Sequence, residues 1–300
     1  MKTKLMAAAA ISFAVMFCSS KFVGAASAPV DANGNSLPNS EVAGAEDSQA
    51  ELAKKLQNPV SNVISVPFQN NFDFDIGPND DGFRYTMNFQ PVVPVSISKD
   101  LNLIIRTIVP FIYQDDVIPG TSQTGLSDIT QSFFFSPKKS VGGWIIALGP
   151  VLLWPTGTDD LLGSDKWGAG PTGILLQQKG PWTFGMLANH IWSYAGNDHR
   201  ADVSSTFLQP FLSYTTKSHT TFGINSESTY DWRNEQWTVP INASVTQLTK
   251  IGKMPIQFAL GFKVYAEGPS GNADWGIRFT VTPVIPFGGT SAEPHQTSAK

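Results

Sequence analysis

The sequence predicts an all-β fold: a transmembrane antiparallel β-barrel of about twelve strands with a short N-terminal helix. Three observations predict it. Apolar and polar residues alternate with a period of two through long segments, long acidic connections alternate with short lysine-bearing ones, and tryptophans gather at the segment ends. Composition agrees, because 15% of the residues are charged and 41% are hydrophobic, which excludes a highly charged disordered chain and a coiled coil.

The N-terminus has the pattern of an export signal. Lys2 and Lys4 precede an apolar run over 5–17, and residues 26–28 read Ala-Ser-Ala, a typical cleavage site. The run is too short to anchor the chain in a membrane, so residues 1–28 are a predicted signal peptide. The single cysteine lies within this segment, and the mature chain is therefore expected to have neither disulfides nor thiolate metal sites.

Residues 29–60 are predicted to form a periplasmic leader that contains one short helix over 46–57. Ser48 and Glu51 have the spacing of a capping box, and Leu52 and Leu56 share one helix face. So short a helix is marginal alone, and we expect it to pack against the barrel as a small plug.

The barrel is predicted over residues 61–287, followed by a flexible tail over 288–300. The segment 64–74 alternates cleanly apart from Asn70, and a second alternating segment covers 83–97. Ten further strands are predicted over 101–114, 125–136, 143–156, 168–178, 181–194, 203–216, 219–232, 236–249, 254–267 and 274–287.

The connections and the tryptophans predict the orientation. All long acidic loops fall at one end and all short turns at the other, which places both termini on the short-turn, periplasmic side. Seven of the eight tryptophans lie at strand ends, as aromatic girdles require, and only Trp167 is expected in a loop. A soluble β-sandwich is the alternative, but it requires neither such long strands nor aromatic residues at both ends.

Prolines inside the predicted strands conflict with a regular ladder, because proline has no N–H to donate. They are Pro67, Pro91, Pro94, Pro110, Pro150, Pro210, Pro240 and Pro283. Either they mark bulges near the rims, or they form a gap through which an apolar solute leaves sideways into the bilayer. The first candidates for such a lateral break are Pro91 and Pro94, with Pro150 and Pro240 next.

Polar side chains on the inner face are the candidate solute path, because a charge facing lipid is costly. The candidates are Arg84, Asn88, Gln90, Arg106, Glu227, Asp231, Lys263 and Arg278. Two interpretations stay open: paired charges that fill a narrow lumen, or a ladder of groups that selects a solute.

Other motifs predict no chemistry. Gly168–Gly173 matches G-x-G-x-x-G but precedes a strand rather than a helix, and the four histidines lack zinc-site spacing. Asp159, Asp160 and Asp165 form a solvated acidic loop or, alternatively, a site for a hard cation. His190 and Ser193 face opposite sides of one strand, so we expect no catalytic residue, no cofactor and no bound metal. A net charge of −4 argues against nucleic acid as a partner.

Several blocks resemble a known family. They are 52–60, 68–78, Gln131–Pro137, Gly142–Trp144, Gly149-Pro150, Trp154–Thr156, 161–163, Trp167–Thr172, Gly180–Trp182, Asn189–Trp192 and Phe207–Tyr214. The chain is similar here to the outer-membrane transporters named after the meta-pathway of phenol degradation, whose members are often labelled "transporter" or "neuromedin U". The resemblance implies an outer-membrane barrel that imports aromatic or other small apolar compounds, and it implies no catalytic residues.

The leading hypothesis is a passive channel in the outer membrane of a Gram-negative bacterium, for small compounds that include aromatic and apolar ones. Its expected partners are outer-membrane lipid, a small solute and, during biogenesis, the barrel-assembly machinery. The alternatives are a lipid-modifying outer-membrane enzyme and a structural envelope barrel.

Overall fold

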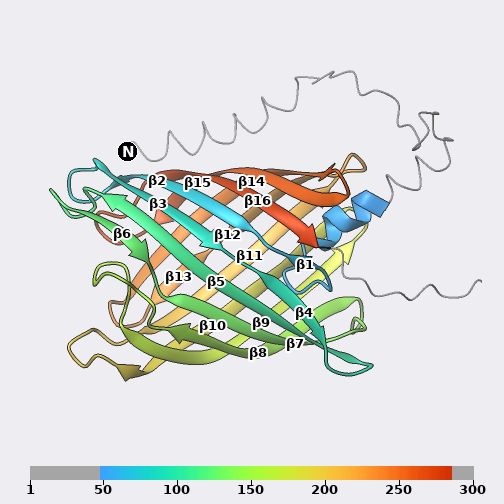
Figure 1. Cartoon of the computed structure of the whole chain (residues 1–300), viewed down its shortest axis with the longest axis horizontal. Helices are drawn as coiled ribbons and strands as arrows, with labels where there is room; N and C mark the ends of the chain where they lie inside the picture. The colour runs from blue at the N-terminus through green and yellow to red at the C-terminus, as the bar shows by residue number, and fades with distance from the viewer. Residues whose placement is uncertain (1–47, 286–300) are drawn as a thin grey trace, which may run out of the picture.

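The computed structural model describes residues 48–285 and shows a closed antiparallel β-barrel (Figure 1). Residues 48–55 are helical. The strands are β1 (Ile64–Ser65), β2 (Phe68–Ile76), β3 (Gly82–Phe89), β4 (Val92–Ser96), β5 (Leu101–Asp115), β6 (Ser122–Leu126), β7 (Ile129–Pro137), β8 (Trp144–Trp154), β9 (Lys166–Lys179), β10 (Trp182–Gly196), β11 (Ser204–Thr215), β12 (Thr220–Ser226), β13 (Ser228–Asp231), β14 (Gln236–Ile251), β15 (Met254–Glu267) and β16 (Trp275–Ile285).

These segments make twelve strands of a barrel, because β1 and β2, β3 and β4, β6 and β7, and β12 and β13 continue one another in pairs. The barrel closes where β16 pairs with β2, for example at Ile277 and Phe72, and with β1. The predicted fold class is confirmed, including the short helix before the first strand.

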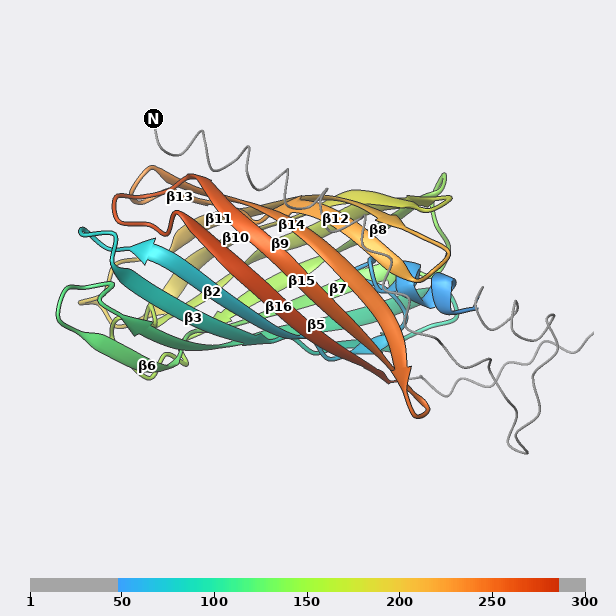
Figure 2. The same cartoon turned by 90° about the horizontal axis from the view of Figure 1, so that it is seen from above.

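The two ends of the barrel differ as predicted. The connections between β2 and β3 and between β8 and β9 lie at the long-loop end, whereas the helix and the last residue of β16 lie at the opposite, short-turn end (Figures 1 and 2). One detail is wrong: Trp167 lies on β9 rather than in a loop. It pairs with Ala195 of β10, and its ring contacts Trp154 at 5.4 Å, so it joins the girdle at the long-loop end.

The outer face is apolar. Large side chains such as Leu148 and Leu260 are 63% and 59% exposed, and a band this extensive is suited to hydrocarbon rather than water. Asn70, which interrupts the apolar face of β2, is satisfied locally. Its Oδ1 accepts from Tyr85 Oη at 2.7 Å and its Nδ2 donates to the Phe279 carbonyl at 3.2 Å. The polar break in the pattern therefore leaves no unpaired amide facing lipid.

The interior has two different halves. Inward-facing side chains of β4, β5 and β7–β10 form an apolar cluster: Val92, Ile104, Phe134, Ala147, Ile174, Leu176 and Leu187, with Val60. The inward-facing side chains of β2, β3 and β12–β16 are mostly polar and charged. An apolar lining explains why β8 and β9 show little alternation in the sequence, because both of their faces are apolar or glycine.

The N-terminal segment packs into the short-turn end of this apolar half. Ala53 is fully buried, Val60 belongs to the apolar cluster, and Gln178 Nε2 of β9 donates to the Lys54 carbonyl at 2.8 Å. The helix therefore contacts the barrel wall, and it ends in a turn at residues 56–57.

Several predictions fall on residues that the structure leaves undescribed. They are the signal peptide over 1–28, the leader up to residue 47, the last barrel residues 286–287 and the tail over 288–300. Within residues 48–285, no helix is long and apolar enough to cross a membrane.

The prolines interrupt the ladder at some positions and not at others. Beside Pro91, the pairing of β3 and β4 with β5 omits two positions and resumes in the same register, and Thr107 N donates to the Pro91 carbonyl at 3.1 Å across that stretch. The wall therefore stays hydrogen-bonded at the place proposed first for a lateral break.

Pro150 of β8 does coincide with an interruption. The pairing of β7 with β8 skips from Ser132 to Phe135, because the carbonyl opposite Pro150 finds no N–H there. The Phe133 carbonyl oxygen instead lies against Gly149, and a Cβ at residue 149 would overlap it. Pro171 of β9, opposite Pro150, is accompanied by a similar gap in the pairing of β9 with β10.

The arrangement of loops predicts which positions are accessible from outside. Cysteine substituted for Asp160, in the long connection before β9, should react with an impermeant maleimide added to intact cells. Cysteine substituted for Lys217, in the short turn before β12, should react only after the outer membrane is opened. Labelling of Lys217→Cys in intact cells would contradict this orientation.

Candidate functional site

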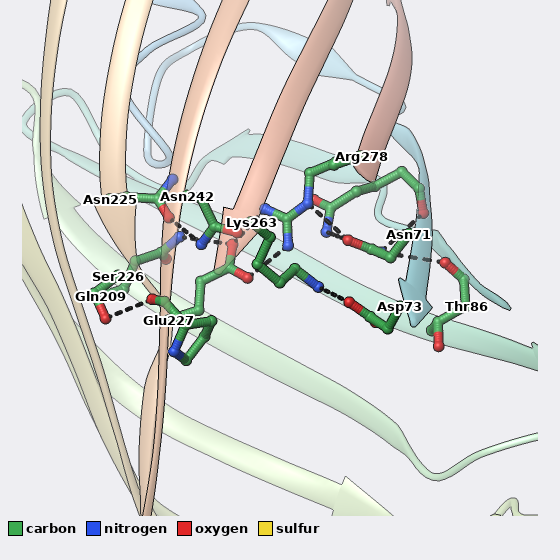
Figure 3. A network of polar contacts seen from close by, with 12 residues as sticks. Asn71, Asp73, Thr86, Gln209, Asn225, Ser226, Glu227, Asn242, Lys263 and Arg278 are labelled. Carbon is green, nitrogen blue, oxygen red and sulfur yellow. Dashed lines mark hydrogen bonds and ion pairs between the residues drawn. The ribbon is translucent and has the colours of Figure 1, made fainter. Parts of the chain in front are cut away.

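The polar half of the lumen is organised around two buried ion pairs (Figure 3). The first joins Lys263 of β15 to Asp73 of β2, with Nζ 2.8 Å from Oδ1 and both side chains less than 10% exposed. Tyr265 donates its hydroxyl to the same Asp73 oxygen at 3.2 Å. These strands lie on either side of β16, so the pair bridges the closing seam of the barrel.

The second pair joins Arg278 of β16 to Glu227, which lies between β12 and β13. Two parallel bonds, Nη1 to Oε1 at 2.8 Å and Nη2 to Oε2 at 2.7 Å, give the bidentate geometry that makes arginine–carboxylate pairs strong. Arg278 Nε also donates to Asn71 Oδ1 on β2 at 2.7 Å. One guanidinium thus connects three segments of the inner wall.

Two further arginines bind neutral amides instead of carboxylates. Arg84 Nε donates to Gln114 Oε1 at 2.9 Å, and Arg106 Nη2 donates to Gln90 Oε1 at 3.0 Å. Gln114 in turn donates to Gln123 Oε1 at 2.7 Å. These contacts extend the network over β3, β5 and β6.

Of the eight lumen candidates, the structure brings six into this network by direct contacts: Arg84, Gln90, Arg106, Glu227, Lys263 and Arg278. Asn88 lies half-buried on the inner face of β3. Asp231 lies elsewhere, at the end of β13, where its carboxylate accepts from the backbone of Arg233 and the side chain of Asn234. It shapes the turn before β14 and makes no contact of this network.

Sequence reasoning left important members out of the candidate set. Asp73 and Asn71 accept from Lys263 and Arg278, and both lie at inward positions of the first predicted strand. Asn242 and Gln257, which are buried, and Asn225, which is half-buried, are uncharged residues of the same wall. The signal for Asp73 and Asn71 was available, because they share the polar phase of β2.

Beside the ion pairs, the lumen contains a cavity of about 140 Å³. Arg278, Asn225, Asn242, Gln257 and Thr282 lie in its lining, and small residues of β15 leave the space. Within residues 48–285, Asn242 Oδ1 and Gln257 Nε2 are buried without a hydrogen-bond partner. Both atoms are shielded from solvent, and buried amide groups without a partner are unusual.

The long-loop end has its own polar contacts. Asp128 accepts from Gly157 N at 3.0 Å and from Ser164 N and Oγ at 2.6 and 2.5 Å, which folds the connection between β8 and β9. Asp202 pairs with Lys166 at 3.1 Å and with Arg233 at 2.7 Å. The hydrogen bond and positive charge of Lys166 lower the pKa of the Asp202 carboxyl.

The acidic loop shows no arrangement for a cation. Asp159 accepts from Leu161 N and Asp165 accepts from Asn197 Nδ2, while Arg200 donates to the Asp160 carbonyl. Over the described range 48–285, no group of three or more His, Cys, Asp or Glu side chains is placed to hold a metal ion.

His190 lies on the outer face of β10 in the girdle at the long-loop end. Its Nδ1 lies 2.7 Å from Thr206 Oγ1, which accepts from Trp232 Nε1 at 2.8 Å. The Trp192 ring is 4.0 Å away. Ser193 is engaged elsewhere, since its hydroxyl contacts Val203 N and Asp202.

The fold is similar to that of the COG4313 outer membrane channel from Pseudomonas putida F1. The TM-score is 0.60 at 14% sequence identity, and the match covers 75% of this chain and 96% of that chain. The NanC porin gives 0.46 at 9% identity, covering 75% and 100%, and outer membrane phospholipase A from Escherichia coli gives 0.41 at 8%, covering 78% and 97%.

The first likeness shows a shared barrel fold and nothing about function, and the last two, with TM-scores below 0.5, carry no argument. No family model and no curated protein sequence matches this chain. Membership of the phenol meta-pathway family therefore stays a prediction from the sequence blocks.

The buried pairs predict a large, reciprocal effect on stability. Lys263→Met leaves the Asp73 carboxylate buried and unpaired, which should cost roughly 3–5 kcal/mol of unfolding free energy. The double variant Lys263→Met, Asp73→Asn should recover most of that loss. Urea titration of the refolded barrel in detergent measures both.

The matched control is Arg233→Met, which removes an ion pair whose two side chains are 55% and 53% exposed and should therefore change stability far less. Equal losses for Lys263→Met and Arg233→Met would contradict a structural role for the lumen pair.

Proposed function

We propose that this protein is a passive outer-membrane channel for small uncharged solutes, including apolar and aromatic ones. The observation that carries the proposal is the two-sided lumen: two buried ion pairs along one wall and an apolar cluster along the other. Charges that are paired in this way hold little attraction for a free ion, and a half-apolar path lowers the cost of passage for an apolar molecule.

The outer surface supports placement in the outer membrane. Its apolar band and aromatic girdles belong to a barrel that spans a bilayer, and the sequence begins with a predicted export signal. The proposal includes the barrel-assembly machinery and outer-membrane lipid as partners during biogenesis. It includes no energy coupling, since the sequence shows no motif for it.

A lipid-modifying enzyme has less support. Such an enzyme requires a nucleophile and a histidine base at the lipid-facing surface. His190 is at that surface, but the hydroxyl paired with it belongs to Thr206, a girdle residue that also binds Trp232. The arrangement is that of an interfacial aromatic belt.

The N-terminal segment is part of the proposed channel, as a plug at the short-turn end. Refolded protein in planar bilayers should show small conductance steps, and liposomes containing it should swell in glycerol or urea faster than in charged solutes of similar size. Deleting residues 48–57 should raise the conductance, because it removes the chain that covers Gln178 and the apolar cluster.

The matched control for the deletion is Lys217→Ala, at the same end but in the turn before β12. Refolded protein without conductance and without solute-dependent swelling would overturn the channel. Unchanged conductance after the deletion would refute the plug but not the channel.

A further inference from the structure

The strongest irregularity of the wall lies at Glu227. The pairing of β11 with β12 and β13 stops at Phe211 and Asn225 and resumes at Leu208 and Ser228. It resumes in the same register, so two consecutive positions on each strand are simply unpaired.

The other side of the same strand is interrupted too. β12 pairs with β14 as far as Ser226 and Ile241, and β13 resumes at Thr229 and Thr238. The pairing of β14 with β15 also shifts between Val239 and Pro240. Three neighbouring seams are therefore disturbed at one place, which we call the Glu227 break (residues 226–228 with Pro210 and Pro240).

Two prolines explain the break. Trp232 N donates to the Ser204 carbonyl, and Leu248 N donates to the His219 carbonyl, so even-numbered residues of β11 and β14 direct their backbone groups toward β12 and β13. Pro210 and Pro240 are even-numbered residues of these two strands, and neither has an N–H. Pro210 therefore leaves the Ser226 carbonyl without a donor, and Pro240 leaves the Glu227 carbonyl without one.

Hollows lie on both faces of the wall at the break. On the inside is the 140 Å³ cavity, with Asn242 and Gln257 in its lining. On the outside is an open groove of about 560 Å³, lined by apolar side chains that include Met186, Pro210, Leu212, Ile224 and Ile241. Asn225 lines both hollows, so only the wall at residues 225–227 separates them.

The inner cavity has a definite chemical preference. The Arg278 charge is already matched by Glu227, so an ion gains nothing there. The rest of the polar lining consists of neutral amide and hydroxyl side chains, among them Asn242, Gln257 and Thr282, which suits an uncharged solute. A cavity of this size class holds a molecule as large as benzene.

We propose that the lumen cavity binds a small neutral molecule, and that this molecule leaves through the Glu227 break into the outer groove and the bilayer. The inference rests on the proposed channel function and specifies where its solute leaves the barrel. An apolar ring gains free energy by leaving water for lipid, so the exit needs no energy source. The Ser226 hydroxyl, which donates to the Pro240 carbonyl at 2.8 Å, keeps the backbone at the break partly satisfied.

The test restores the missing donors. In Pro210→Thr, Pro240→Thr, both strands regain an N–H directed at the break, and the ladder can close without adding bulk at the lumen. The control is Pro91→Thr, Pro94→Thr, which adds two donors where the bond from Thr107 N to the Pro91 carbonyl already spans the interruption. Uptake of radiolabelled benzyl alcohol and of glycerol is measured in porin-deficient cells with a lipopolysaccharide outer membrane.

We expect the Pro210/Pro240 variant to lower benzyl alcohol uptake to the level of cells without the protein, with glycerol uptake unchanged. The control variant should match the wild type for both solutes. Wild-type benzyl alcohol uptake in the Pro210/Pro240 variant would overturn the lateral exit. Wild-type cells that take up neither solute faster than empty cells would instead refute the channel itself.

Discussion

The Arg278–Glu227 ion pair is the interaction on which the interior of this barrel depends. Glu227 lies where the strand formed by β12 and β13 has lost its backbone partners on both sides. Arg278 holds its carboxylate with two bonds and is itself held by Asn71 across the closing seam. A side-chain contact thus replaces part of the backbone ladder. Because both groups are shielded from water, removing either one leaves the other as an unpaired buried charge, which lowers the stability of the fold.

The pair also affects the distribution of charge in the lumen. Lys263 with Asp73 and Arg278 with Glu227 bring equal and opposite charges onto one wall, while Arg84 and Arg106 bind glutamine amides. The opposite wall is apolar and is covered at one end by the segment that carries Val60. The proposed preference for small neutral solutes rests on the two ion pairs and on this apolar wall.

The sequence predicted the barrel well because the outer face obeys a strict rule. Every second side chain meets hydrocarbon, so the period of two is visible in β2, β12 and β16 without knowledge of the partners. The tryptophans were equally informative, apart from Trp167, whose strand begins earlier than its polar neighbours indicated.

The inner face was harder to predict, since no single rule governs it. β8 and β9 are apolar on both faces because they line the apolar half of the lumen, and their alternation is lost. The polar phase of β2 contained Asp73, but its partner Lys263 lies far along the chain and only the closed barrel brings them together. The sequence shows which residues are prolines and therefore lack a backbone N–H. It does not show which neighbouring strand that N–H would have faced, because this depends on the register of the strands, as at Pro210 and Pro240.

The central claim is that the Arg278–Glu227 pair holds closed a wall that the backbone leaves open, and amide hydrogen exchange in a lipid nanodisc tests it most directly. Arg278→Met should accelerate exchange at residues 225–228 while the paired residues 211–215 of β11 stay protected. Lys263→Met, which breaks the other buried pair, should leave residues 225–228 at the wild-type rate. Wild-type protection of residues 225–228 in Arg278→Met would contradict the account.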